Sequence, residues 1–309
     1  MAFDERAHGV YAIAITPFHA DGRVDADSIA RVTDFYLGCG VSGLTVLGIM
    51  GEAPKLDADE ALAIVTAFVA RAKGVPVVVG VSAPGFAAMR TMANGAMERG
   101  AAGVMIAPPS TLRTDDQIVA YYRNAVEAIG TQIPFVIQDY PLLLQVVMTP
   151  QVIRQIVQEH RSCMMLKHED WPGLEKISAL RRFQQDGSMR PLSILCGNGG
   201  LFLDFELSRG ADGAMTGYAF PDMLVDVVRL SRAGDREAAH DLFDAHLPLV
   251  RYEQQQGVGL AVRKYLLQKR GAIASDAQRK PSIALSTAAR GEVDFLLARL
   301  ARRDPRARL

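Results

Sequence analysis

Short apolar runs rich in β-branched residues recur along the chain, each bounded by glycine, proline or polar turn residues. Runs of this length and setting are typical of buried β-strands. Eight strands are predicted in this way, at residues 10–16, 43–47, 76–81, 103–107, 134–138, 163–167, 192–196 and 212–216. Their nearly continuous apolar character indicates a sheet that is covered on both faces.

The segments between these runs have the periodicity of helices. Asp57, with Glu60 three residues later, resembles a capping pair before a helix over residues 61–72. Thr149 is placed to cap another helix, which starts at Pro150. Strands that alternate with helices imply a parallel sheet, and eight of them predict an α/β fold, a closed (β/α)8 TIM barrel. No Gly-x-Gly-x-x-Gly follows the first strand, which weakens a dinucleotide-binding interpretation.

The strand pattern ends near Asp222, and the rest of the chain is predicted to be helical. Helices are expected at residues 222–233, 235–256, 259–270 and 286–302. We therefore expect residues 1–232 to form the barrel and residues 233–309 to form a C-terminal helical extension packed on it. The basic residues 302–308 are predicted to be a solvated tail.

Composition narrows the class of protein but not its chemistry. The 309 residues are 49% hydrophobic and 22% charged, with no net formal charge, as in soluble globular proteins. Balanced charge gives no electrostatic reason to bind nucleic acid or an anionic membrane. Cys39, Cys163 and Cys196 have neither metal-ligand spacing nor that of a disulfide framework. The N-terminus reads as neither a secretory signal nor a membrane span, so a cytoplasmic protein is expected.

Lys167 is the first candidate for catalysis. It closes the sixth apolar run, where a polar stretch begins at His168. Active sites of (β/α)8 enzymes lie at the carboxyl ends of the strands. Burial disfavours the charged form of an amine, and a neutral amine can attack a carbonyl carbon. The other six lysines fall in predicted loops or on predicted helix surfaces, so Lys167 is the predicted Schiff-base nucleophile.

An ordered series of motifs follows the strand ends. It comprises residues 16–18, the Gly-x-x-Gly-Glu turn at 48–52, Leu166 with Lys167, the glycine-flanked loop after Cys196, and residues 210–215. With these motifs, the chain from Gly9 to about Pro281 resembles the dihydrodipicolinate synthase / N-acetylneuraminate lyase family of class I aldolases and dehydratases. The resemblance implies a homo-oligomer, usually a tetramer, that needs no cofactor and acts on a small-molecule 2-keto acid. It also implies that Lys167 condenses with the keto carbon to give an iminium, which serves as an electron sink.

The resemblance implies substrate-binding positions as well, and several carry unexpected residues. Ile49 and Met50 stand where the carboxylate-binding turn usually has two threonines, although backbone N–H groups of Met50 and Gly51 can still bind an anion. Ser110 replaces a second tyrosine, and Leu143 replaces the arginine with which the synthases bind their second substrate. Authentic dihydrodipicolinate synthesis is therefore not expected. The predicted substrate-binding residues are Gly48, Ile49, Met50, Gly51, Ser110, Leu143, Gly197 and Met215.

Proton transfer is the open part of the predicted chemistry. Gln138 occupies the position of the family's catalytic tyrosine, and an amide cannot shuttle protons. Tyr140, two residues later, is the first candidate to replace it. Gln138 with Asp139, together with residues 215–217 and 247–249, also resembles the branch of the family that dehydrates 2-keto-3-deoxy sugar acids.

Two alternatives stand beside a lyase that acts on pyruvate or a 2-keto-3-deoxy acid through Lys167. One is a catalytically impaired family member that binds a keto acid without turnover, because Gln138 replaces the tyrosine. The other is a metal-dependent pyruvate aldolase built on four carboxylates, Glu52, Asp139, Glu169 and Asp170. His168 and Glu169 are adjacent and would point to opposite faces of a strand, so no metal site is predicted. The carboxylates are expected to be helix N-terminal charges and surface salt bridges.

Overall fold

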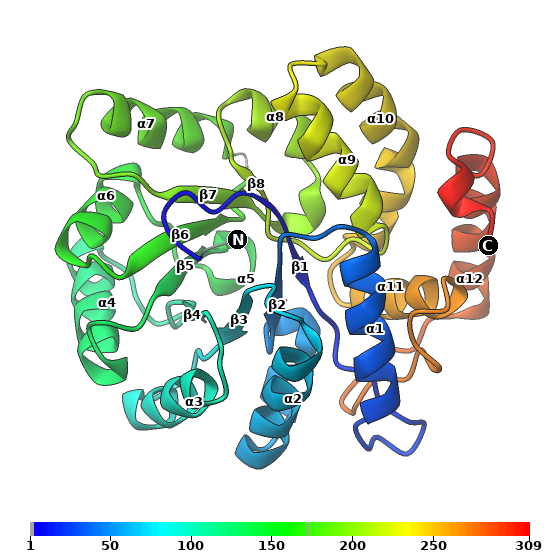
Figure 1. Ribbon diagram of the computed structural model, residues 1–309, viewed down its shortest axis with the longest axis horizontal. Helices are drawn as coiled ribbons and strands as arrows, with labels where there is room; N and C mark the ends of the chain where they lie inside the picture. The colour runs from blue at the N-terminus through cyan, green and yellow to red at the C-terminus, as the bar shows by residue number, and fades with distance from the viewer. Residues whose placement is uncertain (1–2, 172) are drawn as a thin grey trace.

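Eight parallel strands close into a barrel in the order of the sequence, with β8 pairing back onto β1 (Figure 1). A computed structural model describes residues 3–171 and 173–309. The strands are β1 Gly9–Ile13, β2 Gly43–Val46, β3 Val77–Gly80, β4 Gly103–Ile106, β5 Phe135–Asp139, β6 Cys163–His168, β7 Ser193–Cys196 and β8 Gly213–Ala214. The predicted (β/α)8 barrel is confirmed, and most strand ends move by only one to three residues. The eighth strand is two residues long and thus shorter than the predicted 212–216, although backbone hydrogen bonds continue past Ala214.

Helices follow the strands and surround the barrel. They are α1 Ala26–Gly38, α2 Ala58–Arg71, α3 Phe86–Glu98, α4 Asp115–Ile129, α5 Pro141–Leu144, α6 Pro150–Glu159, α7 Leu174–Gln185, α8 Leu203–Ser208 and α9 Pro221–Arg232. Short 3-10 helices lie at Ile49–Gly51 (η1), Ala53–Lys55 (η2), Asn198–Gly200 (η3) and Pro305–Ala307 (η4). The predicted capping box of Asp57 and Glu60 and the Thr149 cap are both confirmed.

The barrel has two apolar layers, one inside the strands and one between the strands and the helices. Side chains alternate along each strand, so every second residue points inward. The inner layer consists of Ala7, Tyr11, Ile13, Val78, Met105, Val136, Met165, Leu195 and Met215. It fills the barrel interior and leaves the next inward positions, toward the carboxyl ends of the strands, for functional side chains.

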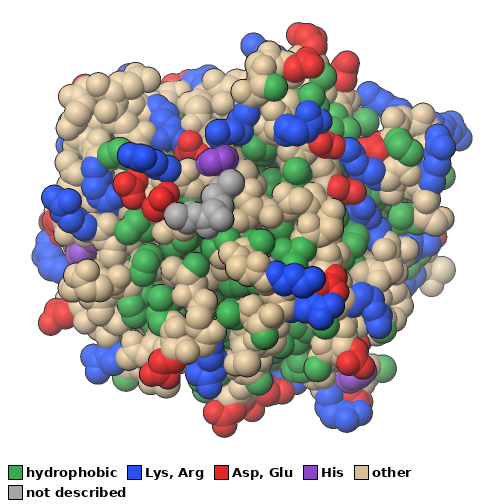
Figure 2. Space-filling model, in the orientation of Figure 1, with side chains coloured by type: hydrophobic (Ala, Val, Ile, Leu, Met, Phe, Trp, Pro, Cys, Tyr) green, Lys and Arg blue, Asp and Glu red, His purple; other side chains and the backbone are tan. Residues whose placement is uncertain are grey.

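The N-terminal segment closes the opposite end of the barrel. In Figure 1 the blue segment before β1 crosses the ring of strands, and Figure 2 shows hydrophobic side chains gathered toward the middle of this face. Phe3 lies against Tyr11, with ring centroids 6.4 Å apart, and occupies the space that a side chain at Gly103 would need. A substrate therefore has its way in at the carboxyl ends of the strands.

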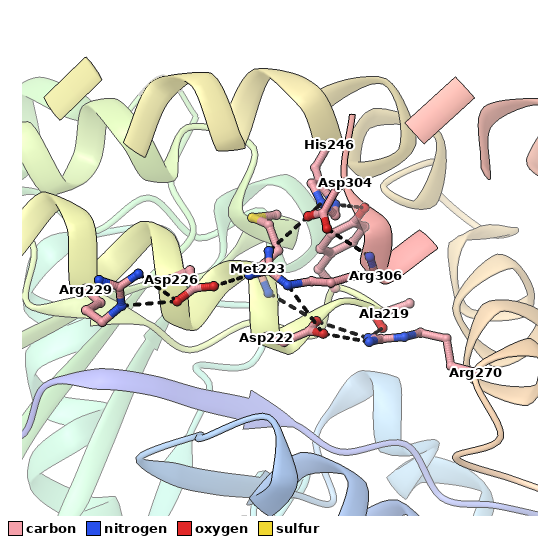
Figure 3. A network of polar contacts seen from close by, with 10 residues as sticks. Ala219, Asp222, Met223, Asp226, Arg229, His246, Arg270, Asp304 and Arg306 are labelled. Carbon is pink, nitrogen blue, oxygen red and sulfur yellow. Dashed lines mark hydrogen bonds and ion pairs between the residues drawn. The ribbon is translucent and has the colours of Figure 1, made fainter. Parts of the chain in front are cut away.

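Three further helices follow the barrel: α10 Arg236–Glu253, α11 Gly259–Lys269 and α12 Thr287–Leu300. The end of the chain is held by ion pairs, seen in Figure 3, in which Arg306 contacts Asp222, Asp226 and Asp304. Asp304 is buried and also binds His246 Nε2 at 2.9 Å. The prediction of a solvated basic tail is wrong for Arg306, because carboxylates of α9 and of the tail itself bind it, whereas Arg302, Arg303 and Arg308 are exposed.

Within the described ranges, no helix is long and apolar enough to cross a membrane.

Candidate active site

Lys167 points from β6 into the barrel, one layer above Met165. The register of β5 and β6 places Gln138 directly beside Lys167. Both side chains are almost completely buried, at 3% and 6% exposure, and both line a cavity of about 640 Å³ at the carboxyl ends of the strands. The structure thus brings together the predicted nucleophile and the position of the missing tyrosine.

Glu169 lies on the same side of the chain as Lys167, two residues further on. Its Oε2 is 3.0 Å from Lys167 Nζ and accepts a hydrogen bond of 2.8 Å from Gln138 Nε2. Because a carboxylate only accepts, the amide of Gln138 must present its NH₂ group here. The expectation of a surface charge at Glu169 is wrong, because side chains two apart on an extended chain share a face.

The loop after β7 completes the setting of this carboxylate. The backbone N–H of Asn198 donates to Glu169 Oε1 at 3.1 Å, and Gln254 Nε2 binds Asn198 Oδ1 at 2.9 Å. A Cβ at Gly197 would overlap Glu169 Cγ, so glycine is needed for this approach. Both oxygens of the Glu169 carboxylate are therefore held in fixed directions.

The Gly-x-x-Gly-Glu turn forms η1 beside this cluster. The N–H of Gly51 donates to Gly48 O at 3.0 Å inside the turn. The prediction that this N–H binds a ligand is therefore wrong. The N–H of Met50 has no hydrogen bond to any described residue, and Met50 lines the cavity with Ile49. Thr16 Oγ1 donates to Gly51 O at 2.6 Å and fixes the turn from β1.

Glu52 closes the turn in a left-handed conformation, with φ of 57°. Its carboxylate binds Lys264 Nζ at 2.5 Å and Lys55 Nζ at 2.8 Å. Lys264 is fully buried and also donates to two carbonyl oxygens, those of Thr16 and Ala277. The prediction that all lysines except Lys167 lie in loops or on helix surfaces is wrong for Lys264, because α11 packs over the turn, and for Lys176 of α7, which is buried against Asp139 and Asp170.

Six predicted site residues line the cavity: Lys167, Gln138, Tyr140, Ile49, Met50 and Leu143. Five others do not: Gly48, Gly51, Ser110, Gly197 and Met215. Ser110 is exposed on the loop after β4, and Met215 is buried in the layer below Lys167. The three glycines shape the loops around the cavity rather than its wall.

Tyr140 is half-buried on the cavity wall. Burial, with the Glu169 carboxylate in addition, raises its pKa to about 12, although the Arg263 guanidinium opposes this shift. A phenol with so high a pKa stays protonated at neutral pH and is poorly matched to proton shuttling. Glu169 is better placed for that task than Tyr140, because it contacts Lys167 directly.

Arg263 of α11 also lines the cavity, with Gly217 and Glu253. Its Nε donates to Glu253 Oε1 at 2.6 Å, and Glu253 Oε2 accepts the N–H of Ala219 at 3.1 Å. Burial raises the pKa of Glu253, and the neighbouring guanidinium opposes the rise. No pattern near Arg263 in the sequence marks it, since it reaches the cavity only through tertiary packing.

The carboxylates considered as metal ligands do not converge. Asp139 and Asp170 both bind Lys176 Nζ at 2.7 Å, and Glu52 and Glu169 bind other lysines. Nowhere in residues 3–171 and 173–309 could a group of three or more histidine, cysteine or acidic side chains hold a metal ion. The buried carboxylates here are matched by lysines instead.

A second buried polar group lies on the other side of β6. His168 is fully buried, 3.9 Å from Asp139 Oδ2 and 3.8 Å from Glu206 Oε1. Burial raises the pKa of Glu206 to about 7, against a partial opposing effect of His168. His168 and Glu169 thus occupy different sides of the chain, as the alternation of a strand requires.

Comparisons with known proteins identify relatives along almost the whole chain. A model of the dihydrodipicolinate synthetase family matches residues 6–300. A protein named L-2-keto-3-deoxyarabonate dehydratase, from Azospirillum brasilense, is 30% identical over 97% of this chain and 96% of its own. A probable 2-dehydro-3-deoxy-D-pentonate aldolase, YjhH of Escherichia coli K12, is 26% identical over 84% of this chain and 90% of its own.

One solved structure is much more similar in sequence. A crystal structure described as dihydrodipicolinate synthase from Rhodopseudomonas palustris is 68% identical, with a TM-score of 0.96. The match covers 97% of this chain and 99% of that one.

Proposed function

The chain belongs to the dihydrodipicolinate synthetase family of Schiff-base lyases, and from that premise we propose that it dehydrates or cleaves a 2-keto-3-deoxy sugar acid through Lys167. The observation that carries the proposal is the contact of Glu169 with both Lys167 and Gln138. It gives the nucleophile a carboxylate partner at the place where the family's tyrosine is missing.

The reaction begins when Lys167 passes a proton to Glu169, 3.0 Å away, and the neutral amine attacks the C2 carbonyl carbon of the substrate. Glu169 then returns the proton to the carbinolamine hydroxyl, which leaves as water and gives an iminium, whose positive nitrogen withdraws electrons from C3. Glu169 is within 3.0 Å of that nitrogen, so its negative charge stabilises the iminium as it forms. The pair keeps its charge balance in the step, because the lysine cation and the iminium carry the same charge.

Glu169 also serves as the group that carries protons. In dehydration it takes a proton from C3, and the enamine then expels the C4 hydroxyl as water with that proton. In cleavage it takes the proton of the C4 hydroxyl, the C3–C4 bond breaks, and an aldehyde leaves from the enamine. A single carboxylate can therefore serve either reaction, and general acid–base help of this kind is worth about 10²–10⁴-fold in rate.

Gln138 acts as a positioning residue in this scheme. Its amide donates to Glu169 Oε2 at 2.8 Å, which directs the other lone pairs of the carboxylate toward Lys167 and the cavity. The free N–H of Met50 is the group that we assign to the C1 carboxylate of the substrate. Ile49 and Leu143 give this end of the cavity apolar walls.

The relatives support a sugar-acid substrate, since two of them carry names of 2-keto-3-deoxy-pentonate enzymes. A second candidate, dihydrodipicolinate synthesis, is favoured by the 68% identity with the Rhodopseudomonas palustris protein. Leu143 argues against it, because the resemblance places there the arginine that binds the synthases' second substrate. The impaired, binding-only alternative is disfavoured by the carboxylate at Glu169, which can move a proton where Gln138 cannot.

We also infer that the enzyme is a cytoplasmic homo-oligomer, as the family resemblance implies. Leu142, Leu143 and Val147, which follow β5, are 45%, 48% and 63% exposed and form a candidate contact surface. Light scattering of the purified protein measures the assembly: a tetramer or dimer is expected, and a monomer would contradict it.

Product analysis tests the function. Incubation with a 2-keto-3-deoxy pentonate, followed by NMR and mass spectrometry, distinguishes loss of one water from release of pyruvate and a two-carbon hydroxyaldehyde. Either product set supports the proposal. Formation of 4-hydroxy-tetrahydrodipicolinate from pyruvate, with the pentonate unchanged, would establish the second candidate instead. Binding without any product would establish the impaired alternative.

A further inference from the structure

Arg263 is a buried cation whose hydrogen-bonding capacity is mostly unused. Only 3% of the side chain is exposed, and among the described residues Nε alone has a partner, Glu253 at 2.6 Å. Nη1 is buried without a hydrogen bond to any residue that the structure describes. A buried donor left without an acceptor costs about 1–3 kcal/mol, and such groups in native proteins commonly face a ligand or ordered water.

The guanidinium is held at the cavity rather than in the core. Arg263, Gly217 and Glu253 all line the same cavity as Lys167. A Cβ at Gly217 would overlap Nη1, so the glycine makes room for the guanidinium at the wall. Glu169 and Tyr140 line this cavity too, so the guanidinium and the Glu169 carboxylate border the same space.

The charge of Glu253 limits which ligand groups Arg263 can bind. Its carboxylate is 2.6 Å from Nε and is itself anchored by the N–H of Ala219. The ion pair is already neutral, so a second buried carboxylate on the ligand would have no matching charge. A hydroxyl oxygen, in contrast, accepts a hydrogen bond without adding charge.

The charges of the other ionisable side chains at the cavity lead to the same conclusion. Lys55 and Lys167 are matched by Glu52 and Glu169, and behind them Lys264 adds one positive charge. One surplus positive charge suits one substrate carboxylate, that of C1, and leaves none for a second. The ligand chain beyond C3 is therefore expected to be neutral and hydroxylated.

We propose that Arg263 is the specificity-determining residue that donates hydrogen bonds to a hydroxyl oxygen at C4 or C5 of the substrate. The inference rests on the proposed function, because it takes the iminium at Lys167 as the fixed end of the substrate. It assigns the substrate class as hydroxylated 2-keto monoacids of about five carbons, in preference to 2-keto diacids.

Two substitutions test this role while they leave a cation beside Glu253. Arg263→Lys keeps a cation for Glu253 but lacks the two terminal nitrogens, and Gly217→Ala displaces Nη1 through its added Cβ. For each variant, the half-saturating concentration for borohydride trapping is measured with three probes: pyruvate, a 2-keto-3-deoxy pentonate and 2-oxoglutarate. Thermal melting of each variant establishes that the fold is retained.

The pentonate is expected to bind the unmodified enzyme more tightly than 2-oxoglutarate, and both variants should weaken it about 10- to 100-fold, the effect of one charged hydrogen bond. Pyruvate has no group beyond C3, so its half-saturating concentration should change less than twofold. Equal weakening of pyruvate and pentonate would overturn the proposal, because Arg263 would then hold the C1 carboxylate or act only on the fold. Preference for 2-oxoglutarate, with the larger loss in Arg263→Lys, would overturn the assignment of a neutral group. No trapping of any probe would sink the Schiff-base function itself.

Discussion

Replacement of Glu169 by glutamine is the sharpest perturbation of the proposed chemistry. The side chain keeps its size, and its carbonyl oxygen can still accept the Asn198 N–H that lies 3.1 Å from Glu169 Oε1. What is lost is the negative charge beside Lys167 and the only carboxylate that contacts its amine among the described residues. The variant therefore separates proton transfer from the shape of the site.

The expected effect follows from the two functions of the carboxylate. General acid–base catalysis contributes about 10²–10⁴-fold, which corresponds to about 3–5 kcal/mol of activation free energy. In Glu169→Gln, kcat for a 2-keto-3-deoxy pentonate should fall by at least 10²-fold. The iminium should still form on long incubation, because Lys167 is intact, so the final yield of borohydride-trapped pyruvate should stay near that of the unmodified enzyme.

The assay pairs steady-state kinetics with trapping, and Glu175→Gln serves as the matched control. Glu175 lies on α7 with its side chain 78% exposed and pairs only with Arg209 among the described residues. Its replacement should leave kcat unchanged within a factor of two. A value of kcat above one third of the unmodified rate in Glu169→Gln would refute the assignment of Glu169 as the proton carrier and would return Tyr140 to that role.

Three further changes test the packing around the site. Gly197→Ala should lower kcat at least tenfold with trapping retained, because its Cβ displaces Glu169; unchanged kinetics would contradict the close approach. Lys264→Met should lower the free energy of unfolding by about 3 kcal/mol, because Glu52 loses its buried partner. Lys269→Met on the surface should lower it by less than about 1 kcal/mol. Equal losses of the two variants in chemical denaturation would contradict a stabilising role of the buried pair. Glu206 holds its proton in the folded state up to about pH 7 but only to 4.5 when unfolded, so the native enzyme loses stability as pH rises between these values. Melting curves should show Glu206→Gln equal to the unmodified protein near pH 4.5 and more stable by roughly 3 kcal/mol at pH 8, and a constant difference would show that Glu206 is not shifted.

The sequence predicts the barrel well because its signal is local. Each strand is a short apolar run between turn residues, and helix starts such as Asp57 and Thr149 carry their own capping groups. Lys167 is identified for the same reason, since a lysine at the end of an apolar run is a pattern of neighbouring residues. Glu169 also had a local signal, because Lys-x-Glu at a strand exit puts both side chains on one face.

The rest of the site depends on contacts between distant parts of the chain. Lys264 and Arg263 are adjacent on α11, yet one contacts the turn at Glu52 and the other lies against Gly217. A basic residue on a helix is normally solvated, and only the packing of α11 over the barrel buries these two. The fixed end of the tail has the same origin, because Arg306 finds its partners on α9.

Lys167 is predicted to form the covalent intermediate with the substrate. The direct measurement is reduction with borohydride in the presence of a 2-keto-3-deoxy pentonate or pyruvate, followed by peptide mass spectrometry. The predicted result is one adduct per chain, on the peptide that carries Lys167, and none in Lys167→Ala. An adduct on Lys264 or Lys176 instead, or no adduct while product still forms, would contradict the assignment of Lys167 as the Schiff-base nucleophile.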